Sequence, residues 1–441
     1  MGRLLGAPRS RCRRLVLLLL PALGCVAACG ADPGPARPPN IVLVIGDDHG
    51  WPDSGFMGSR VARTPHLDEL AREGVVFTHG FSTSSSCRPA LLSLLTGFHP
   101  LQLEARLGQP ISAFPLGSPA IIASLETLPE LLAERGYVSL QGGKFWEGSY
   151  TRAGFSEGVT GAGSHGLELG RAEMQPLWDF IGAHRDEPFF VWFAPLLPHL
   201  PFDAPKELEE PYRELGLDPA AAGYFANVTR LDQRVGEIAA FLESAGLRDR
   251  TLLVYLSDNG WEVGGRRHPA LGGDRGKFSI YELGFRTPVL MSWPGVLPEG
   301  MRDDRLLSSV DLFATLLDFA GVEVAPDRPG RSLRALLLEG GEFRREQVAG
   351  GMTALRPPLD GAPARGRTRA EVAWFLRTGD WRYVRYPERG REELYRIGED
   401  PFEERDVADS HPDELAVLRR DLAQWIRKAR HSAAGPADGP F

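Results

Sequence analysis

The chain has 441 residues, of which 43% are apolar, 24% charged and 9% aromatic. This is the composition of an ordinary globular protein, so it excludes a disordered chain, a collagen and a coiled coil. The formal net charge of −8 argues against broad electrostatic binding to nucleic acid, which needs a surplus of Lys and Arg. We therefore expect no nucleic-acid partner.

Residues 1–28 are predicted to form a signal peptide. Five arginines within the first 14 residues precede an apolar run that begins at Leu15, and this run is short for a membrane span. It ends in Val-Ala-Ala-Cys, which resembles the processing site of a bacterial lipoprotein with Cys29 as the lipidated residue; plain cleavage is the alternative. Residues 29–38 are Gly/Pro/Ala-rich and predict a tether. We expect an exported protein, periplasmic or at the cell surface, held to the membrane only by this lipid.

Four short apolar runs, each followed by a polar or glycine-rich turn, predict strands that are buried on both faces. Because helical segments lie between them, we expect residues 39–355 to form an α/β domain, a large and mostly parallel sheet sandwiched by helices. The predicted strands are Ile41–Ile45, Tyr137–Leu140, Phe189–Phe193 and Leu252–Leu256. The predicted helices are Pro65–Glu73, Ala90–Thr96, Thr127–Arg135, Phe225–Ser244 and Ser308–Ala320.

The C-terminal part differs in character. Residues 356–369 are rich in Pro, Gly and Arg and predict a linker. Residues 370–441 predict a small α+β subdomain. In it, Val372–Arg377 and Trp381–Arg385 alternate in polarity around a Gly-Asp turn, which is typical of a hairpin. An amphipathic helix is expected from about Pro412 to Arg430.

Acidic side chains follow two of the predicted strands. Asp47 and Asp48 follow the first strand, and Asp258 and Asn259 follow the last of the four. Open α/β sheets bind ligands at the carboxyl ends of their strands, and adjacent carboxylates repel unless a cation or a shared proton intervenes. These oxygens suit Ca²⁺ or Mg²⁺ better than Zn²⁺. Turn capping is the alternative for each pair alone, but two pairs at one sheet edge favour a cation site.

Lysine is scarce in this chain, with four among 50 Lys and Arg residues. Lys206 and Lys428 lie in charged, helix-like surface sequence. Lys144 and Lys277 lie in glycine-rich turns, where a compact and titratable ammonium serves a chemistry that arginine serves poorly. We therefore interpret Lys144 and Lys277 as candidate functional residues.

Cys87 is the thiol that remains after the predicted processing at Cys29. Pro89 and Gly97 delimit a short helix, so Cys87 is expected at or near its N-terminus. Exposed N–H groups there favour an anion and lower a thiol pKa. A buried cysteine acting as a small apolar residue is the alternative. A single nucleophile at an anion-binding helix start, beside a hard cation, suits attack on a phosphate or sulfate ester.

Short motifs follow one another in order along most of the chain. They are Asp47-Asp48-His49-Gly50, Thr64-Pro65-His66-Leu67-Asp68, Cys87-x-Pro89 with Leu94-Leu95-Thr96-Gly97, Gly143-Lys144, Pro198-His199-x-Pro201-Phe202, Ser257-Asp258-Asn259-Gly260, Arg275-Gly276-Lys277, Tyr281-Glu282-x-Gly284-Phe285-Arg286-x-Pro288 and Trp293-Pro294-Gly295. As an ordered set, they resemble the type I sulfatases of the alkaline phosphatase superfamily. The resemblance implies the α/β fold of that superfamily and the hydrolysis of sulfate esters.

The resemblance also implies a modified cysteine. Cys87 would be oxidised to Cα-formylglycine (3-oxoalanine) by a formylglycine-generating enzyme, and the aldehyde would hydrate to a diol that attacks sulfur and later expels sulfate. Lys144 and Lys277 would neutralise the sulfate. His199 would protonate or orient the leaving group; a histidine stacked in a Pro-rich turn is the alternative. Ca²⁺, or else Mg²⁺, would be bound by Asp47, Asp48, Cys87, Asp258 and Asn259.

Two positions depart from the family pattern. The family motif is Cys-x-Pro-x-Arg, but Leu91 stands at the Arg position, which normally helps to hold the modified residue and forms part of the maturation signal. Arg88 is a candidate substitute. The family usually has a histidine two residues after the first lysine, where this chain has Trp146. The candidates to replace that histidine are His49, Glu147 and His268.

The sequence therefore predicts an exported sulfatase that acts on an aryl or carbohydrate sulfate, so its partner would be a sulfated small molecule or glycan. A phosphonate or phosphate ester hydrolase on the same scaffold is one alternative. A non-catalytic surface binding protein is another, because Leu91 and Trp146 depart from the pattern. The segments 98–120, 146–170 and 201–217 are expected to be irregular loops that set specificity.

Overall fold

The structure is a computed structural model that describes residues 37–159, 168–260, 275–354 and 371–431. The predicted signal peptide, the lipidation at Cys29, the linker at 356–369 and His268 therefore lie outside the described residues, as does most of the predicted tether. Within the described ranges, no helix has the length and apolar character needed to cross a bilayer. Residues from Pro38 onward cluster as one unit.

Among the described residues, the larger sheet has eight strands. They are β1 (Asn40–Gly46), β2 (Val75–Phe81), β3 (Val138–Gly143), β4 (Glu157–Val159), β5 (Phe189–Ala194), β6 (Thr251–Ser257), β7 (Val289–Ser292) and β8 (Met301–Ser308). Their order is β4-β3-β5-β1-β6-β7-β2-β8. Only β7 runs antiparallel to its neighbours in this sheet, so the predicted mostly parallel sheet is confirmed, with β1 near its centre.

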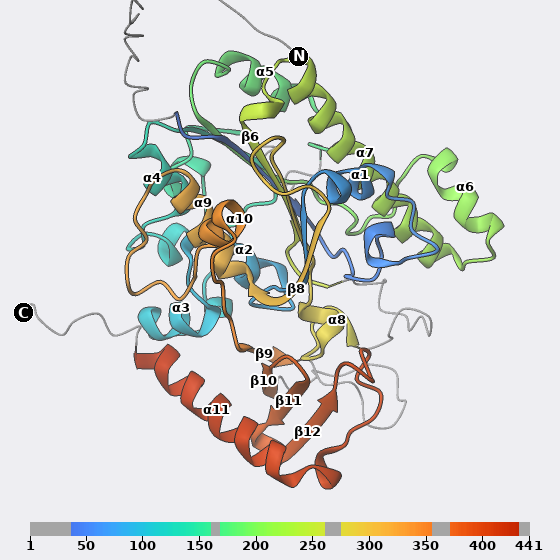
Figure 1. Cartoon of the computed structure of the whole chain (residues 1–441), viewed down its shortest axis with the longest axis vertical. Coiled ribbons are helices and arrows are strands. Elements are labelled where there is room, and N and C mark those ends of the chain that lie inside the picture. The colour runs from blue at the N-terminus through green and yellow to red at the C-terminus, as the bar shows by residue number, and fades with distance from the viewer. Residues whose placement is uncertain (1–36, 160–167, 261–274, 355–370, 432–441) are drawn as a thin grey trace, which may run out of the picture. The chain divides into compact units, whose positions relative to one another are not determined.

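Helices cover both faces of this sheet (Figure 1). Alternate residues of β1 enter two different clusters of buried side chains, since successive residues of a strand point to opposite faces. One face packs against α2 (Cys87–Thr96), α4 (Leu128–Ala133) and α9 (Ser309–Phe319). The other packs against α1 (Pro65–Glu73), α5 (Gln175–Ala183) and α7 (Pro219–Ser244).

The predicted helices are confirmed with small changes at their ends. Helix α7 begins six residues before the predicted start, at Pro219, because Asp218 accepts hydrogen bonds from the N–H groups of Ala220 and Ala221 and so caps the helix. All three segments expected to be irregular contain a regular element, which corrects the sequence interpretation. These elements are helix α3 (Pro100–Leu107), strand β4 and helix α6 (Lys206–Glu214).

The smaller sheet has four antiparallel strands within the described part of the chain. They are β9 (Val348–Ala354), β10 (Glu371–Arg377), β11 (Trp381–Tyr386) and β12 (Arg391–Arg396), in the order β12-β11-β10-β9. The predicted hairpin is confirmed as β10 and β11. Strand β9 precedes the predicted linker, so this sheet also takes a strand from residues 39–355.

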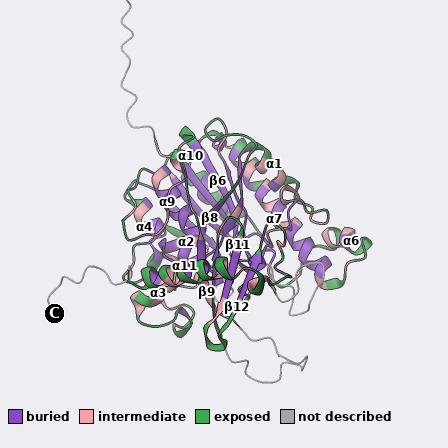
Figure 2. Cartoon of the chain, turned by 60° about the horizontal axis from the view of Figure 1, so that its bottom comes forward, coloured by how far each residue is buried: buried purple, intermediate pink, exposed green. Residues whose placement is uncertain are grey.

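Helix α11 (Pro412–His431) covers one face of the small sheet through Leu418 and Leu422. Figure 2 shows the strands buried and much of α11 exposed. The other face packs against Ile280 and Phe285, and the latter ends the short helix α8 (Glu282–Phe285). One further helix, α10 (Arg334–Glu339), contacts α9.

The parallel register brings the polar turns together at one edge of the large sheet. Gly46 at the end of β1 pairs with Ser257 at the end of β6, and Gly143 at the end of β3 pairs with Ala194 of β5. A side chain at Gly143 would lie 2.1 Å from the Ala194 carbonyl oxygen, and its φ is +95°, so only glycine fits here. The residues that follow these strands therefore converge, as the sequence predicts.

Candidate active site

Asp47 and Asp48 leave the end of β1 in a tight turn. The Asp47 N–H donates to the Leu197 carbonyl at 2.8 Å, and the Asp48 N–H donates to Asp258 Oδ1 at 3.2 Å. Asp48 has a φ of +64°, a left-handed conformation that aspartate tolerates better than most residues. Both side chains are buried. The turn therefore holds two adjacent carboxylates at the sheet edge.

Asp258 and Asn259 follow β6 and face the same place. Asn259 Nδ2 donates to Asp48 Oδ1 at 2.7 Å, and Asp258 Oδ1 accepts from the Asn259 N–H at 2.7 Å. Asp258 Oδ2 and Asn259 Oδ1 are buried and have no hydrogen-bond partner among the described residues. Buried oxygen atoms normally have a partner, so these two acceptors are placed for a ligand.

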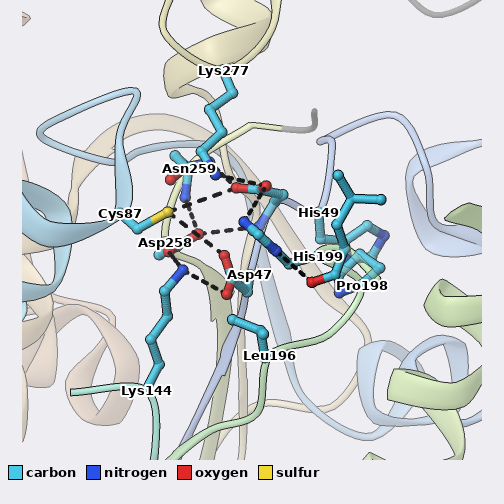
Figure 3. Close-up of polar contacts among 12 residues, drawn as sticks. Asp47, His49, Cys87, Lys144, Leu196, Pro198, His199, Asp258, Asn259 and Lys277 are labelled. Atoms are coloured by element: carbon cyan, nitrogen blue, oxygen red, sulfur yellow. Dashed lines mark hydrogen bonds and ion pairs between the residues drawn. The ribbon is translucent and has the colours of Figure 1, made fainter. Parts of the chain in front are cut away.

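Cys87 is the first residue of α2 and points at these carboxylates (Figure 3). Its Sγ lies 3.7 Å from Asp47 Oδ1 and 3.8 Å from Asp48 Oδ1. Ligand atoms of Asp47, Asp48, Cys87 and Asp258 all lie within 4.8 Å of one another. We call Asp47, Asp48, Cys87, Asp258 and Asn259 the acidic cluster.

The expectation of a lowered thiol pKa at this helix start is wrong for the unmodified side chain. Cys87 is buried, and burial raises the pKa of its thiol well above the ordinary value; the negative charge of Asp258 raises it further. These effects outweigh the nearby lysine. Cys87 is therefore a neutral thiol in this environment, a poor nucleophile as it stands.

Two lysines flank the acidic cluster from opposite sides (Figure 3). Lys144 Nζ lies 2.6 Å from Asp47 Oδ2, and Lys277 Nζ lies 2.8 Å from Asp48 Oδ2. Burial by itself would lower the pKa of each lysine, but Asp47 beside Lys144 and Asp48 beside Lys277 raise both pKa values above the ordinary range. Both side chains therefore stay charged.

The three carboxylates do not behave alike. Burial, helped by the charge of Asp47, raises the pKa of Asp258 to about 7, and burial also raises the pKa of Asp48. For Asp47, burial is outweighed by Lys144, so its pKa falls below the ordinary value. Two ammonium groups thus face three buried carboxylates, and Lys144 Nζ, which lies 2.6 Å from Asp47 Oδ2, lies 3.7 Å from Asp258 Oδ2. The oxygens of Asp47, Asp48, Asp258 and Asn259, two of which have no hydrogen-bond partner among the described residues, fit a hard divalent cation.

His199 reaches the cluster from the loop after β5. Its Nε2 lies 3.6 Å from Asp48 Oδ2, while Nδ1 contacts the Leu200 carbonyl at 2.8 Å. A carbonyl can only accept, so Nδ1 carries the hydrogen and Nε2 is the atom that faces the cluster. The ring is a quarter exposed, unlike the carboxylates beneath it.

The sequence gives no motif for the two residues that hold the His199 loop. Arg171 donates to the carbonyls of Leu196, His199 and Pro201, the last two at 2.6 and 3.0 Å. Asn227 Nδ2 donates to the Pro201 carbonyl at 3.1 Å. Asn227 is fully buried in α7, and a polar residue inside an apolar helix segment is the signal that sequence reasoning missed.

The family departures lie side by side. Leu91 and Trp146 line one apolar cavity, which Arg88 also lines, and Lys144 Nζ lies 4.7 Å from the centre of the Trp146 ring. Arg88, the candidate substitute for the missing arginine, forms a two-pronged ion pair with Glu147 at 2.7 and 2.9 Å. This ion pair therefore fixes the side chains of Arg88 and Glu147.

His49 does not face the acidic cluster. Its Nδ1 contacts the Tyr255 hydroxyl, and its Nε2 lies 2.8 Å from the Asp53 carbonyl. Burial lowers the pKa of His49 to about 4, so the ring is neutral. His49 therefore supports the turn after β1. It does not replace the family histidine, whose position two residues after Lys144 is occupied by Trp146.

Comparison with known proteins gives concordant results. The family model for the sulfatases matches residues 39–322. N-acetylgalactosamine-6-sulfatase of Rattus norvegicus is 30% identical over 387 residues, which cover 75% of this chain and 70% of the relative.

Two solved structures share the fold. One is the crystal structure of Ps i-CgsB in complex with k-i-k-neocarrahexaose, with a TM-score of 0.73 at 23% identity over 89% of this chain and 94% of that chain. The other is BT4656 in complex with its substrate D-glucosamine-2-N,6-O-disulfate, with a TM-score of 0.68 at 19% identity over 90% and 99%. These likenesses confirm the predicted α/β fold with its small C-terminal subdomain.

Proposed function

The chain belongs to the sulfatase family of the alkaline phosphatase superfamily, and on that premise we propose that its acidic cluster hydrolyses the sulfate ester of a carbohydrate. The chain is a sulfatase, and hydrolysis of a sulfate ester is its reaction. Two proteins support the sugar as substrate: the rat relative is an N-acetylgalactosamine-6-sulfatase, and BT4656 has a disulfated glucosamine as its substrate.

One observation carries the site assignment. Cys87 Sγ lies within 3.8 Å of two carboxylates, and these carboxylates are each bound by a buried lysine. Asp47, Asp48, Asp258 and Asn259 would hold a Ca²⁺ ion, with Mg²⁺ as the alternative. A bound cation supplies positive charge for a sulfate oxygen. Formylglycine, formed from Cys87, supplies as its hydrate the oxygen nucleophile that the neutral thiol does not.

The remaining residues act on the substrate directly. We assign Lys144 and Lys277 to the sulfate oxygens, where two buried ammonium groups stabilise negative charge most strongly because little water screens them. His199 would hold a proton at Nε2 and pass it to the oxygen of the leaving alcohol, while its Nδ1–H stays on the Leu200 carbonyl. Its partly exposed ring suits contact with a substrate that enters from solvent.

The export route and the domain boundaries belong to the same proposal. We propose that residues 1–28 direct export, that Cys29 carries a lipid, and that a formylglycine-generating enzyme modifies residue 87 during maturation. Residues 356–369 would link the catalytic domain, residues 39–355, to the C-terminal subdomain. Cell fractionation of the wild-type chain and of Cys29→Ala tests the anchor: the wild type should enter the membrane fraction and the variant should not. A wild type found only in the soluble fraction contradicts the anchor.

The test of the function combines mass and turnover. The chain is produced together with a formylglycine-generating enzyme, and the tryptic peptide that contains residue 87 is weighed. We expect an aldehyde in place of the thiol, and release of sulfate from sulfated sugars when Ca²⁺ is present. Cys87→Ala, weighed and assayed in the same way, is the matched control.

Three other outcomes have distinct meanings. Faster turnover of phosphonate or phosphate esters than of any sulfate ester would favour the alternative hydrolase on this scaffold. An intact thiol, with binding of sulfated sugars but no turnover, would favour the non-catalytic binding protein. A confirmed aldehyde with no sulfate release from sugar or aryl esters would refute the proposed function.

A further inference from the structure

Phe278, next to Lys277, has a backbone conformation that a bulky residue rarely adopts. Its φ is +60°, in the left-handed region that favours glycine. The residue is also 39% exposed, so burial of the ring does not offset the strain of the backbone. Strain at an exposed aromatic residue is typical of a functional position rather than a packing position.

The surroundings place this residue at the acidic cluster. The Phe278 N–H donates to the Ser85 carbonyl at 2.9 Å, two residues before Cys87. Lys277 Nζ lies 5.3 Å from the centre of the Phe278 ring and 2.8 Å from Asp48 Oδ2. One ammonium group therefore contacts both a carboxylate of the cluster and the exposed ring.

The turn that carries Lys277 and Phe278 is well anchored. Ser279 Oγ donates to the Arg275 carbonyl at 2.5 Å, and the Ser279 N–H donates to the Gly276 carbonyl at 3.1 Å. Hydrogen bonds between the residues on either side of Phe278 therefore fix the turn around it. The ring is presented by a fixed turn, which is what a recognition surface requires.

We infer that Phe278 is a specificity-determining residue whose ring packs against the sugar ring of a sulfated carbohydrate while Lys277 holds the sulfate. This inference rests on the proposed function and adds a residue that recognises the alcohol part of the substrate. The face of an aromatic ring carries partial negative charge, and the C–H groups on one face of a pyranose complement it. An alkyl sulfate without a ring offers no such face.

The test measures binding rather than turnover. Cys87→Ala is the background, Ca²⁺ is present, and the ligands are N-acetylgalactosamine 6-sulfate and ethyl sulfate, titrated by calorimetry. Phe278→Ala removes the ring, Phe278→Gly removes the ring and relieves the backbone, and Phe278→Tyr restores a ring. Val417→Ala, at an exposed position of α11, is the matched control for loss of an exposed apolar side chain.

We expect Phe278→Ala and Phe278→Gly to raise the Kd of the sugar sulfate about tenfold and that of ethyl sulfate less than about twofold. Phe278→Tyr should bind like the background, and Val417→Ala should not change either Kd. The thermal midpoint of Phe278→Gly should be no lower than that of the background, so weaker binding cannot be attributed to unfolding.

Equal weakening of both ligands, or no change in either, overturns the role of Phe278. If Phe278→Ala weakens the binding of phenyl sulfate but not that of the sugar sulfate, the ring selects aryl groups, which also overturns the proposed role of Phe278. Turnover by the wild-type chain is measured separately. If the wild-type chain releases sulfate but Phe278→Ala binds the sugar sulfate with an unchanged Kd, only this inference is refuted. If the wild-type chain neither binds nor hydrolyses any sulfate ester, the proposed function is refuted as well.

Discussion

Two buried groups of charges in this molecule are built in opposite ways. The acidic cluster has three carboxylates and is flanked by two lysines. The second group joins α8 to the small sheet, and we call it the arginine network; it consists of Glu282, Arg286, Arg377, Arg382 and Glu403. There, Arg382 pairs with Glu403 at 2.8 Å, and Arg377 and Arg286 lie 3.4 and 3.7 Å from Glu282.

The difference matches the basic residue type found in each group. In the arginine network, guanidinium groups outnumber carboxylates, and Arg382 and Glu403 are fully buried. A guanidinium carries five donors in a fixed plane, so it suits permanent ties between elements. In the acidic cluster, carboxylates outnumber ammonium groups. Buried atoms without a hydrogen-bond partner among the described residues occur in both groups, and in the acidic cluster they are Asp258 Oδ2 and Asn259 Oδ1. A compact ammonium leaves room beside these oxygens for a ligand, so lysine suits the site and arginine suits the scaffold.

The largest effect on function is expected at the acidic cluster. Replacing Cys87 with Ala removes the residue that we propose as the precursor of the nucleophile, so sulfate release should fall by about 10⁴-fold or more. The thermal midpoint should change little, because the side chain is small. Parallel activity and unfolding assays check this. A variant whose rate stays within about tenfold of wild type would contradict the assignment.

The largest effect on stability is expected in the arginine network. Arg382→Ala leaves the fully buried Glu403 without its partner, which should lower the free energy of unfolding by about 3–5 kcal/mol. Denaturant unfolding measures this, and Arg420→Ala on the exposed side of α11 is the control, expected to stay within about 0.5 kcal/mol. Equal stability of both variants would mean that the network is not a structural tie.

An exchange of lysine for arginine separates the two roles directly. Lys144→Arg keeps the charge but puts a larger planar group against Asp47, so kcat/KM should fall by about 10²-fold with little change in stability. Lys206→Arg, at an exposed position, is the matched control and should behave as wild type. If Lys144→Arg keeps its full kcat/KM, the site needs only a positive charge, and lysine has no role there that arginine cannot fill.

The smallest expected effect is a dependence of stability on pH. Burial raises the pKa of Glu403 to about 7 from 4.5, with Arg382 opposing the rise. The folded protein therefore binds more protons than the unfolded chain between these values, so this group makes the free energy of unfolding fall as the pH rises from about 4.5 to about 7. We expect the free energy of unfolding, measured with urea at about pH 4.5 and about pH 7, to fall less in Glu403→Gln than in the wild type. An identical slope in both proteins would contradict it.

The sequence predicts the sheet and the convergence of its polar turns because both depend on local patterns. Uninterrupted apolar runs define buried strands, and parallel strands bring the residues after Gly46 and Ser257 to one edge. The pKa of Cys87 could not be predicted in the same way. It depends on burial and on carboxylates 39 or more positions away in the chain, and neither can be deduced from the neighbouring residues.

The supports of the site are equally non-local. Arg171 and Asn227 hold the His199 loop through main-chain carbonyls, and a carbonyl carries no residue identity that a motif could reveal. The pairing of Arg88 with Glu147 joins the start of α2 to the segment after Lys144. Such contacts follow from the packed structure and require coordinates.

The central place of β1 has a consequence for the order of events during synthesis. Its residues pair with β5 about 150 positions later and with β6 about 210 positions later. A ribosome must therefore make more than half of the polypeptide before the first strand can dock on both sides. Until then residue 87 has no closed pocket around it, so the formylglycine-generating enzyme that we propose would have its best access on the growing, unfinished chain and would lose this access once the sheet closes.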